Sequence, residues 1–198
     1  MRNIYFILMF PLTVPHLICY RFAKNRRKID ADVERHENVV KKTDLKLLQV
    51  AYLLIFQKEF RNLFYYRIGR LNFFLRYLPR LSTLYINVPD GKIGGGLVIQ
   101  HGFSTIITAE SIGKNCWINQ QVTIGYNDSK TYGYGKPVIG DNVRISAGAK
   151  VVGPITIGNN SMVGCNAVVS KDLPENTVVV PSAMRIIREN GRKTSKTF

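Results

Sequence analysis

A six-residue repeat of aliphatic residues dominates the second half of the chain. A helix repeats about every 3.6 residues and a strand about every 2, so a period of six requires short strands separated by corners. Stacked coils of this kind form a solenoid, in which each coil covers the hydrophobic core of its neighbour. The repeated aliphatic residues, with one extra residue before Ile106, are Ile93, Ile99, Ile106, Ile112, Ile118, Ile124, Ile139, Ile145, Val151, Ile157, Val163 and Val169.

Small or β-branched residues, which fit a narrow interior, recur four places after the repeated aliphatic residue. Glycine and asparagine are frequent between these positions, and both residue types tolerate the positive φ angles of tight corners. We therefore predict a β-solenoid over residues 86–180. The predicted second set of inward residues is Cys116, Val122, Val143, Ala149, Ile155, Ser161 and Ala167.

The repeat is interrupted once, between Ile124 and Ile139, where fifteen residues pass instead of six. An insertion in a solenoid lies outside the core and often forms part of a binding surface. Tyr126 and Lys136 are suited to contacts with a sugar or a nucleotide, and we predict that they bind substrate. The alternative is a solvated loop without a function.

Residues 1–85 show helical rather than six-residue spacing. Residues 4–20 are apolar and are followed by basic residues, which fits either an anchor on a membrane surface or a broken core helix. Residues 45–56 are apolar on all sides, which predicts a buried or lipid-contacting helix. Residues 57–80 place apolar residues at helical spacing and intersperse arginines, which we expect to face water. The charged residues 29–44 are expected to form a solvated helix or linker. Within the C-terminal tail, 181–198, the basic residues 192–198 are expected to be frayed.

The chain has 198 residues and a net charge of +15. Residues 1–89 contain 16 basic and 6 acidic residues, a net +10, so the excess lies mostly outside the repeat. Such a surface favours an anionic partner. No nucleic-acid-binding motif is recognisable, so we do not expect nucleic acid to be that partner. Three scattered cysteines favour a reducing cytoplasm, and the inner face of the membrane is an alternative location.

Several motifs of the repeat resemble those of a known family. Residues 92–101 (KIGGGLVIQH), 122–125 (VTIG), 137–140 (PVIG) and 147–150 (AGAK) are similar to segments of the hexapeptide-repeat acyltransferases, in particular the serine acetyltransferase-like branch. The resemblance implies a left-handed parallel β-helix with an N-terminal α-helical region. It also implies a homotrimer, with substrate clefts between the subunits.

His101 is the only histidine within the repeat, and it lies two places after Ile99, so we predict that it projects outward. Its position matches the catalytic base of the resembled family. The implied reaction is acetyl transfer from acetyl-CoA to a hydroxyl, where a base removes the proton of the alcohol during its attack on the thioester. The acid that orients the base in that family is absent at the matching place, and we expect Asn87 or a backbone carbonyl group to replace it.

Two further departures from the resembled family concern the acceptor. Gln100 stands where that family has an acid for an amino acid's ammonium group, and Gly135-Lys136 stands where it has an Arg-His pair. These changes favour a sugar hydroxyl of a surface polysaccharide or its precursor, with Gln100 in contact with the acceptor. The alternatives are a serine O-acetyltransferase of cysteine biosynthesis and a solenoid scaffold without catalytic activity.

The resemblance also suggests where acetyl-CoA binds. Small residues on late coils would admit the pantetheine arm, and cationic residues would meet the phosphates. No metal is expected, because a zinc site needs several clustered ligands and the repeat contains a single histidine. The predicted CoA-binding residues are Ala147, Gly148, Ala149, Lys150, Gly164, Ala167, Lys171 and Arg185.

Overall fold

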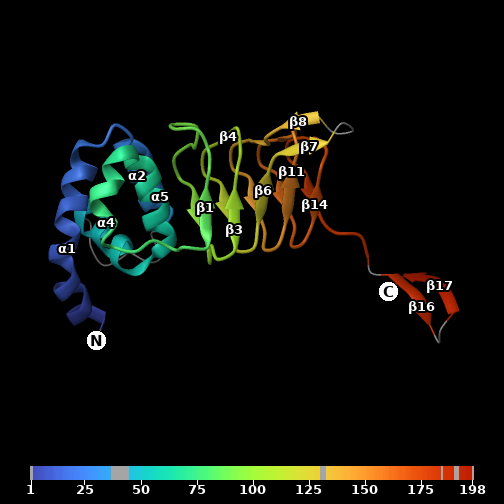
Figure 1. The fold of residues 1–198 in the computed structure, drawn as a ribbon, viewed down its shortest axis with the longest axis horizontal. Helices are drawn as coiled ribbons and strands as arrows, with labels where there is room; N and C mark the ends of the chain where they lie inside the picture. The colour runs from blue at the N-terminus through green and yellow to red at the C-terminus, as the bar shows by residue number, and fades with distance from the viewer. Residues whose placement is uncertain (1, 37–44, 130–132, 184, 190–191, 198) are drawn as a thin grey trace.

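The computed structural model describes residues 2–36, 45–129, 133–183, 185–189 and 192–197. An N-terminal group of helices adjoins a stack of short parallel strands, and a C-terminal hairpin projects from the far end of the stack (Figure 1). The helical region and the parallel sheets were both expected from the sequence.

The helices pack around their own hydrophobic core, which includes Tyr20, Val33, Leu53 and Phe64. The helix predicted over residues 57–80 is divided, because Gly69 adopts a φ of 59° and ends its first part. The helical elements are α1 (Arg2–Phe22), α2 (Arg26–Glu34), α4 (Lys46–Phe56), α5 (Lys58–Ile68) and the 3₁₀ helix η1 (Gly69–Leu75).

The parallel strands form three sheets, and the chain visits them in the same order in every turn of the stack. Sheet 1 contains β1 (Leu84–Ile86), β3 (Thr105–Ile107), β6 (Thr123–Gly125), β11 (Lys150–Val152) and β14 (Val168–Val169). Sheet 2 contains β2 (Val98–Ile99), β5 (Trp117–Ile118), β10 (Arg144–Ile145), β13 (Met162–Val163) and β15 (Val178–Val179). Sheet 3 contains β4 (Ser111–Ile112), β9 (Val138–Ile139) and β12 (Thr156–Ile157).

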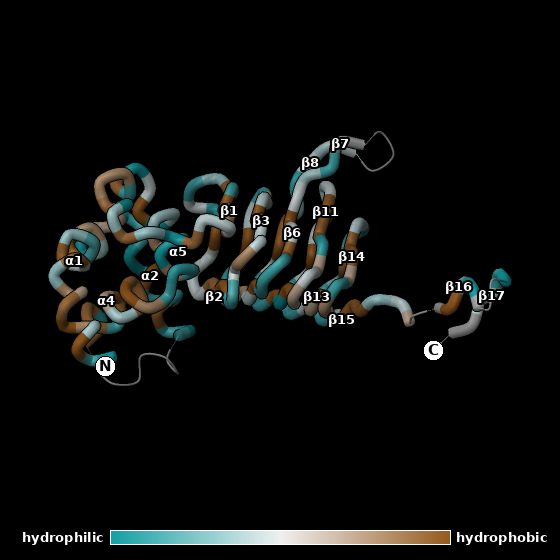
Figure 2. The backbone as a smooth tube through the Cα atoms, turned by 60° about the horizontal axis from the view of Figure 1, so that its bottom comes forward, coloured by the Kyte–Doolittle hydropathy of each residue, from teal (hydrophilic) through white to brown (hydrophobic). Residues whose placement is uncertain are grey.

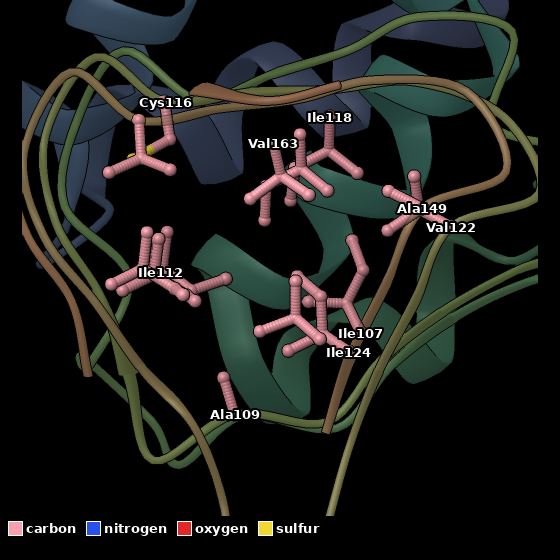
Figure 3. Packing of buried hydrophobic residues seen from close by; sticks show 14 of the residues in the cluster. Ile107, Ala109, Ile112, Cys116, Ile118, Val122, Ile124, Ala149 and Val163 are labelled. Atoms are coloured by element: carbon pink, nitrogen blue, oxygen red, sulfur yellow. The ribbon is translucent and has the colours of Figure 1, made fainter. Parts of the chain in front are cut away.

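The three sheets enclose one hydrophobic interior, into which the labelled side chains of Figure 3 point. Hydrophobic stretches alternate with hydrophilic corners along the strands in Figure 2. All seven residues predicted to be small inward residues are buried, from Val122 and Ala149 at 0% exposure to Ile155 at 7%. The period of six therefore identified the interior positions of these coils correctly.

One predicted inward residue is wrong. Ile106 is 44% exposed, whereas its neighbour Ile107 is fully buried and pairs with Ile124. The cause is the corner before β3, where His101 and Ser104 both have positive φ angles, of 52° and 51°. Eight residues separate Ile99 from the inward Ile107, two more than a period of six and one more than the spacing predicted to Ile106. The shift by one residue reverses the faces of the strand.

Asparagines occupy corners in the way the sequence predicted. Asn142, Asn160 and Asn176 have φ angles between 56° and 58°. Their side chains form a ladder, in which Asn142 donates to Asn160 at 2.9 Å and Asn160 donates to Asn176 at 3.1 Å. Each coil is thus fixed to the next by side-chain as well as backbone hydrogen bonds.

Two hairpins lie outside the stack. The insertion after β6 forms the antiparallel strands β7 (Asn127–Ser129) and β8 (Gly133–Gly135), which protrude at one corner (Figure 1). The tail was expected to be frayed, but it contains the antiparallel pair β16 (Arg185–Glu189) and β17 (Arg192–Thr197). Backbone pairing between these strands overrides the high charge that suggested disorder.

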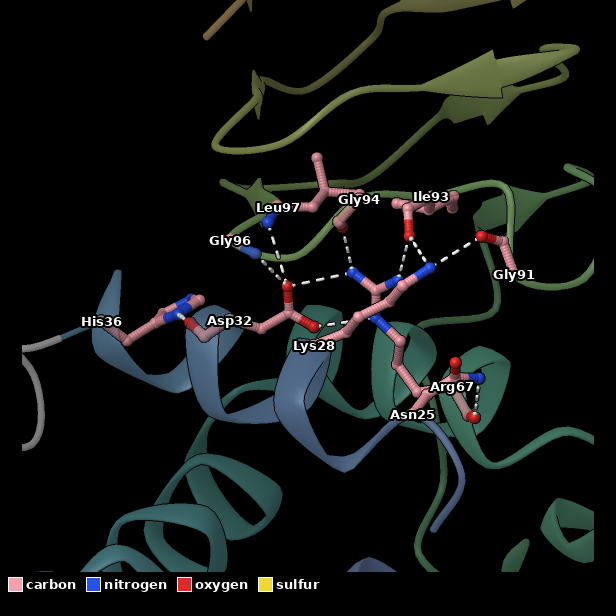
Figure 4. A network of polar contacts seen from close by, with 10 residues as sticks. All are labelled: Asn25, Lys28, Asp32, His36, Arg67, Gly91, Ile93, Gly94, Gly96 and Leu97. Carbon is pink, nitrogen blue, oxygen red and sulfur yellow. Dashed lines mark hydrogen bonds and ion pairs between the residues drawn. The ribbon is translucent and has the colours of Figure 1, made fainter. Parts of the chain in front are cut away.

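A buried ion pair joins the helices to the first coil (Figure 4). Arg67 on α5 contacts Asp32 on α2 at 2.9 Å, and both side chains are 1% exposed. Arg67 also donates to the carbonyl oxygens of Ile93 and Gly94, each at 2.6 Å. Asp32 Oδ1 accepts from the backbone N–H groups of Gly96 and Leu97, at 2.8 and 3.0 Å. This network connects two helices to four backbone groups within residues 93–97, at a solenoid corner.

The network corrects two sequence expectations. The arginines of residues 57–80 were expected in water, yet Arg61 and Arg67 are buried, at 5% and 2% exposure. Residues 29–36 were expected to be solvated, yet Ile29, Asp32 and Val33 are buried as well. The partners of these residues are distant in sequence, so local charge patterning could not reveal their burial.

We expect Arg67→Met to lower the free energy of unfolding by about 3–5 kcal/mol, because it leaves the Asp32 carboxylate and two carbonyl groups buried without their partner. Arg70→Met, on an exposed arginine three residues later, is the matched control and should change it by about 0.5 kcal/mol or less. Urea denaturation followed by fluorescence of Trp117, the single tryptophan, provides the measurement. Equal midpoints for the two variants would contradict a role of the ion pair in joining the two parts.

The revised face of β3 predicts that two adjacent isoleucines differ in energetic importance. Ile107→Ala should destabilise the protein by about 2–5 kcal/mol, because it opens a cavity in the closed interior. Ile106→Ala should cost about 0.5 kcal/mol or less, because this side chain faces solvent. The same urea titration compares them, and a larger loss for Ile106→Ala would restore the original face assignment.

Candidate active site

His101 follows β2 at the corner between sheet 2 and sheet 1. It is exposed to solvent, as the repeat predicted. The backbone there is in the left-handed region, and the His101 carbonyl oxygen accepts a hydrogen bond from the N–H of Phe103 at 2.6 Å. Gly102 comes next, and a Cβ atom there would lie 2.8 Å from Ile99 Cγ2. The corner therefore packs closely and holds the histidine at a fixed place on the surface.

A pocket of about 310 Å³ lies beside His101, between the helical region and the first coils. One wall comes from the solenoid and the other from the end of α2 and the junction of α4 with α5. The lining residues are Arg35, His36, Gln57, Glu59, Val98, Ile99, Gln100, His101 and Trp117.

The helical wall brings two opposite charges to the pocket. Glu59 lies in the first turn of α5, and its Cγ atom would be 3.3 Å from a Cβ atom built at Gly102. The guanidinium carbon of Arg35 lies 5.9 Å from the centre of the Trp117 ring. Sequence reasoning missed both residues, because they are distant in sequence from the repeat and match no motif.

His36 is the second histidine of the pocket, and its surroundings differ from those of His101. Burial lowers the pKa of His36, and the hydrogen bond from its Nδ1 to the Asp32 carbonyl oxygen, at 2.8 Å, only partly offsets this effect. Burial likewise raises the pKa of the Asp32 carboxyl group to about 6, against the opposing effect of Arg67. The favoured state of His36 is therefore neutral, and its ring is fixed by the same residue that joins the two parts of the protein.

The solenoid wall of the pocket carries two polar side chains, Gln100 and Trp117. Gln100 Oε1 accepts a hydrogen bond from Asn119 Nδ2 at 3.0 Å, which orients the Gln100 amide. The indole Nε1 of Trp117 is buried and has no hydrogen-bond partner among the described residues. The Gln100 amide N–H groups can donate to an oxygen atom of a bound molecule without losing an existing donor interaction.

Most of the remaining predicted residues divide between two edges of the stack. The His101 edge comprises the corners from sheet 2 to sheet 1, residues 100–104, 119–122, 146–149 and 164–167. The insertion edge comprises the corners from sheet 1 to sheet 3, residues 87–92, 108–110, 126–129, 133–137, 153–155 and 170–172. Sheet 1 separates the two edges.

The His101 edge carries the small residues that were predicted to receive CoA. Backbone hydrogen bonds link its corners, from Gly148 N to Gln120 O at 3.0 Å and from Asn166 N to Ala147 O at 2.9 Å. Gly148 has a φ of 72°, and a Cβ atom there would lie 2.0 Å from Asn166 Oδ1, so only glycine fits. The two later corners, residues 146–149 and 164–167, carry only small or medium-sized side chains, so an extended chain could lie along this part of the edge.

Some predicted CoA contacts are placed elsewhere. Ala149 and Ala167 are buried in the solenoid interior, at 0% and 2% exposure, so their side chains pack in the core. The Lys150 ammonium group donates to the carbonyl oxygens of Gln121 and Gly148, at 2.7 and 2.9 Å. Lys171 lies at the insertion edge, and Arg185 begins β16 beyond the stack. Gly164 lies on the His101 edge but is buried.

Asn87, Tyr126 and Lys136 all lie at the insertion edge. The Asn87 N–H donates to the Ile107 carbonyl oxygen at 2.8 Å, at the end of β1 opposite to the His101 corner. Tyr126 contacts Tyr134 of the hairpin, with ring centres 6.1 Å apart. The structure of one chain therefore does not bring these three residues to the pocket at His101.

A larger hollow, of about 820 Å³, lies beneath η1 and is lined by Arg70, Arg76 and Arg80 among others. It contains none of the residues predicted to act in catalysis. Within the part of the chain that the structure describes, no group of three or more His, Cys, Asp or Glu side chains is placed to hold a metal ion. The pocket at His101 is therefore the stronger candidate for chemistry.

Comparisons with known proteins agree with the repeat. Residues 136–171 match a family model described as bacterial transferase hexapeptide (six repeats). A serine acetyltransferase of Staphylococcus epidermidis is 39% identical over 127 residues, and one of Staphylococcus aureus is equally similar. The chain is therefore similar to hexapeptide-repeat transferases and to proteins named serine acetyltransferases.

The match covers 62% of this chain and 59% of the length of each staphylococcal relative. The crystal structure of the Neisseria gonorrhoeae serine acetyltransferase shares the fold, with a TM-score of 0.60 and 24% identity over 88% of this chain and 66% of that one. The soybean serine acetyltransferase apoenzyme has a TM-score of 0.58 and 26% identity, over 79% of this chain and 66% of that one. The fold thus extends beyond the matched repeat into the helical region.

Proposed function

We propose that the protein is an acetyl-CoA-dependent O-acetyltransferase that uses His101 as its general base and a small hydroxyl-bearing amino acid, L-serine, as its acceptor. The observation that carries this proposal is the pocket in which an exposed imidazole, a carboxylate and a guanidinium converge. The two similar staphylococcal proteins are named serine acetyltransferases, which supports the same acceptor.

The proposed chemistry assigns a proton transfer to His101. Acetyl-CoA supplies a thioester, whose carbonyl carbon is open to attack by an alcohol. His101 accepts the proton of the acceptor hydroxyl as its oxygen forms the new ester bond, and then returns a proton to the departing thiolate sulfur. The position of His101 at the mouth of the pocket, on a closely packed corner, suits it to hold the proton between these two steps.

The opposite charges of the pocket suit the acceptor's zwitterion. Glu59 can accept hydrogen bonds from an ammonium group, and Arg35 can donate to a carboxylate in a paired geometry. These residues would replace the acid and the Arg-His pair that the repeat lacks at Gln100 and Gly135-Lys136. The sugar acceptor was favoured from residues of the repeat alone. Because Glu59 and Arg35 of the helical region also line the pocket, we now favour serine.

A sugar hydroxyl is the second candidate acceptor. The Gln100 amide, oriented by Asn119, is suited to a neutral hydroxyl, and Lys136 would suit an acidic sugar. Neither similar relative is named for a polysaccharide acceptor, so the sugar ranks below serine. A solenoid without catalytic activity is the third candidate.

For the cosubstrate, we infer that the pantetheine arm of CoA lies along the His101 edge beside Ala147, Gly148 and Gly164. The inferred coils wind in the left-handed sense of the resembled family, and the inferred assembly is a cytoplasmic homotrimer. In such an assembly Tyr126, Lys136, Asn87 and Lys171 would act at a neighbour's site. Residues 1–85, 86–180 and 181–198 are the proposed helical, catalytic and tail regions.

Thiol release from acetyl-CoA, measured with a panel of acceptors, tests the proposal. L-serine should give turnover, whereas D-serine and L-alanine should not, because the first has the wrong handedness and the second has no hydroxyl. Turnover with sugars but not with serine would select the second candidate. Binding of CoA without turnover of any acceptor would select the scaffold.

We expect His101→Ala to lower kcat by about 10²–10⁴-fold, which is the typical contribution of a positioned general base. His36→Gln should reduce kcat by less than about tenfold, because His36 is partly buried and hydrogen-bonded to a backbone carbonyl. Circular dichroism should show both variants folded. A greater loss for His36→Gln than for His101→Ala would transfer the role of base to His36.

We expect Glu59→Gln and Arg35→Gln each to raise the KM for serine about 10–100-fold, because each removes one charged hydrogen bond of about 1.5–3 kcal/mol. The KM for acetyl-CoA should stay within about twofold, since neither residue lies on the His101 edge. Glu175→Gln, on an exposed residue of the last coil, is the matched control. An unchanged KM for serine in both pocket variants would remove them from the acceptor site.

A further inference from the structure

The outward face of α1 is apolar along its whole length. Successive residues of a helix are rotated by about 100°, so the exposed apolar residues of α1 fall within an arc of about 160° that contains no charged residue. From residue 4 to residue 22 this face extends about 27 Å, at about 1.5 Å per residue. Its residues are Ile4, Ile7, Leu8, Pro11, Leu12, Val14, Pro15, Ile18 and Phe22.

The inward face of α1 is fixed to the protein by polar contacts. Thr13, His16 and Tyr20 are buried on this face. His16 Nε2 lies 3.1 Å from the Tyr65 hydroxyl and 3.2 Å from the Leu75 carbonyl oxygen, and burial lowers the pKa of His16 to about 4. Insertion of α1 across a bilayer would break these contacts and expose their polar groups to lipid. The helix is thus built to remain attached to the protein.

The 3₁₀ helix η1 continues the apolar surface. Tyr77 lies just after η1 and donates to the Leu12 carbonyl oxygen at 2.8 Å, which places it against α1. Phe73 and Phe74 are among the most exposed large apolar residues, at 68% and 76%, and their rings contact each other. Aromatic side chains exposed beside an apolar helix are typical of proteins that bind at a membrane interface.

Positive charge surrounds this surface. Arg70, Arg76 and Arg80 are exposed and line the 820 Å³ hollow beneath η1, where Asp90 is the single acidic residue among the described lining residues, so the hollow carries a net positive charge. Arg21 and Arg27 are exposed at the other end of α1. Anionic lipid headgroups attract such cations with about 1 kcal/mol for each residue close to the surface.

We propose that the outward face of α1 together with η1 is a docking surface for an anionic membrane, on which α1 lies flat. The apolar side chains enter the acyl-chain boundary, and the arginines of the hollow contact lipid phosphates. A second copy of the chain is a poorer occupant, because it would bring another net +10 from residues 1–89 against the first. The docking surface lies at the end of the stack remote from the C-terminal hairpin, so docking leaves the later coils accessible (Figure 1).

Flotation of the full-length protein with vesicles tests this proposal. We expect binding to vesicles of phosphatidylcholine with phosphatidylglycerol, at least tenfold weaker binding to phosphatidylcholine alone, and release when NaCl is raised. Ile7→Glu/Leu8→Glu should weaken binding at least tenfold. Its matched control is Val168→Glu/Val178→Glu on the late coils, because Val168 and Val178 are 69% and 64% exposed, against 69% and 70% for Ile7 and Leu8.

A second pair of variants tests the electrostatic part and does not alter α1. Arg70→Gln/Arg76→Gln should weaken binding to the anionic vesicles at least tenfold, whereas Lys92→Gln/Lys114→Gln, a control of equal charge, should weaken it by less than twofold. Circular dichroism checks that each variant is folded.

Three outcomes would overturn the proposal. The first is that wild-type protein fails to float with the anionic vesicles. If light scattering also shows that Ile7→Glu/Leu8→Glu reduces the size of an oligomer, the outward face of α1 binds a second copy of the chain. Retention on vesicles in high salt and in alkaline carbonate would indicate a spanning helix instead. Equal binding of the arginine and lysine variants would exclude the hollow as the contact with phosphate.

Discussion

The buried pair of Asp32 and Arg67 is the contact on which the site depends. A histidine at a solenoid corner faces solvent on one side, and a pocket forms only where a second wall is added. Here that wall consists of the end of α2 and the start of α5, the two helices that the ion pair joins to the first coil. Isolated buried charges are costly, but each charge in this pair also contacts two backbone groups, so the pair favours one docking geometry over others.

The order of residues along and just after α2 connects the Asp32–Arg67 ion pair to the pocket at His101. Asp32 lies three and four residues before Arg35 and His36, which is about one helical turn, so the residue that anchors α2 also sets the position of two lining residues. The Asp32 carbonyl oxygen contacts the His36 ring directly. On α5, Glu59 precedes Arg67 by eight residues and lies on the same docked helix. The helical region therefore supplies the charges of the pocket rather than only covering the solenoid.

The sequence predicted those features that depend on local periodicity. The inward positions from Cys116 to Ala167 follow from a period of six and were correct. Ile106 was wrong because the inward residues Ile99 and Ile107 are eight residues apart, two more than the period allows. The helices were foreseeable, but the burial of Arg67 was not, because its partner Asp32 is 35 residues away. The same reason explains why His101 was found and Glu59 and Arg35 were missed. The repeat predicts whether a side chain of the solenoid points inward or outward. The position of a side chain on a helix that packs against the solenoid cannot be predicted until the tertiary contact is known.

The distribution of the remaining predicted residues has a geometric meaning. His101 and the small residues Ala147 and Gly148 lie on one edge of the stack, and Tyr126 and Lys136 lie on another, with sheet 1 between them. A ring of identical subunits uses heterologous contacts, in which one surface of a subunit meets a different surface of the next. A threefold ring is therefore the kind of assembly that can place the insertion edge of one copy against the His101 edge of its neighbour. In that proposed arrangement, Tyr126 and Lys136 would lie beside the substrate cleft of another subunit.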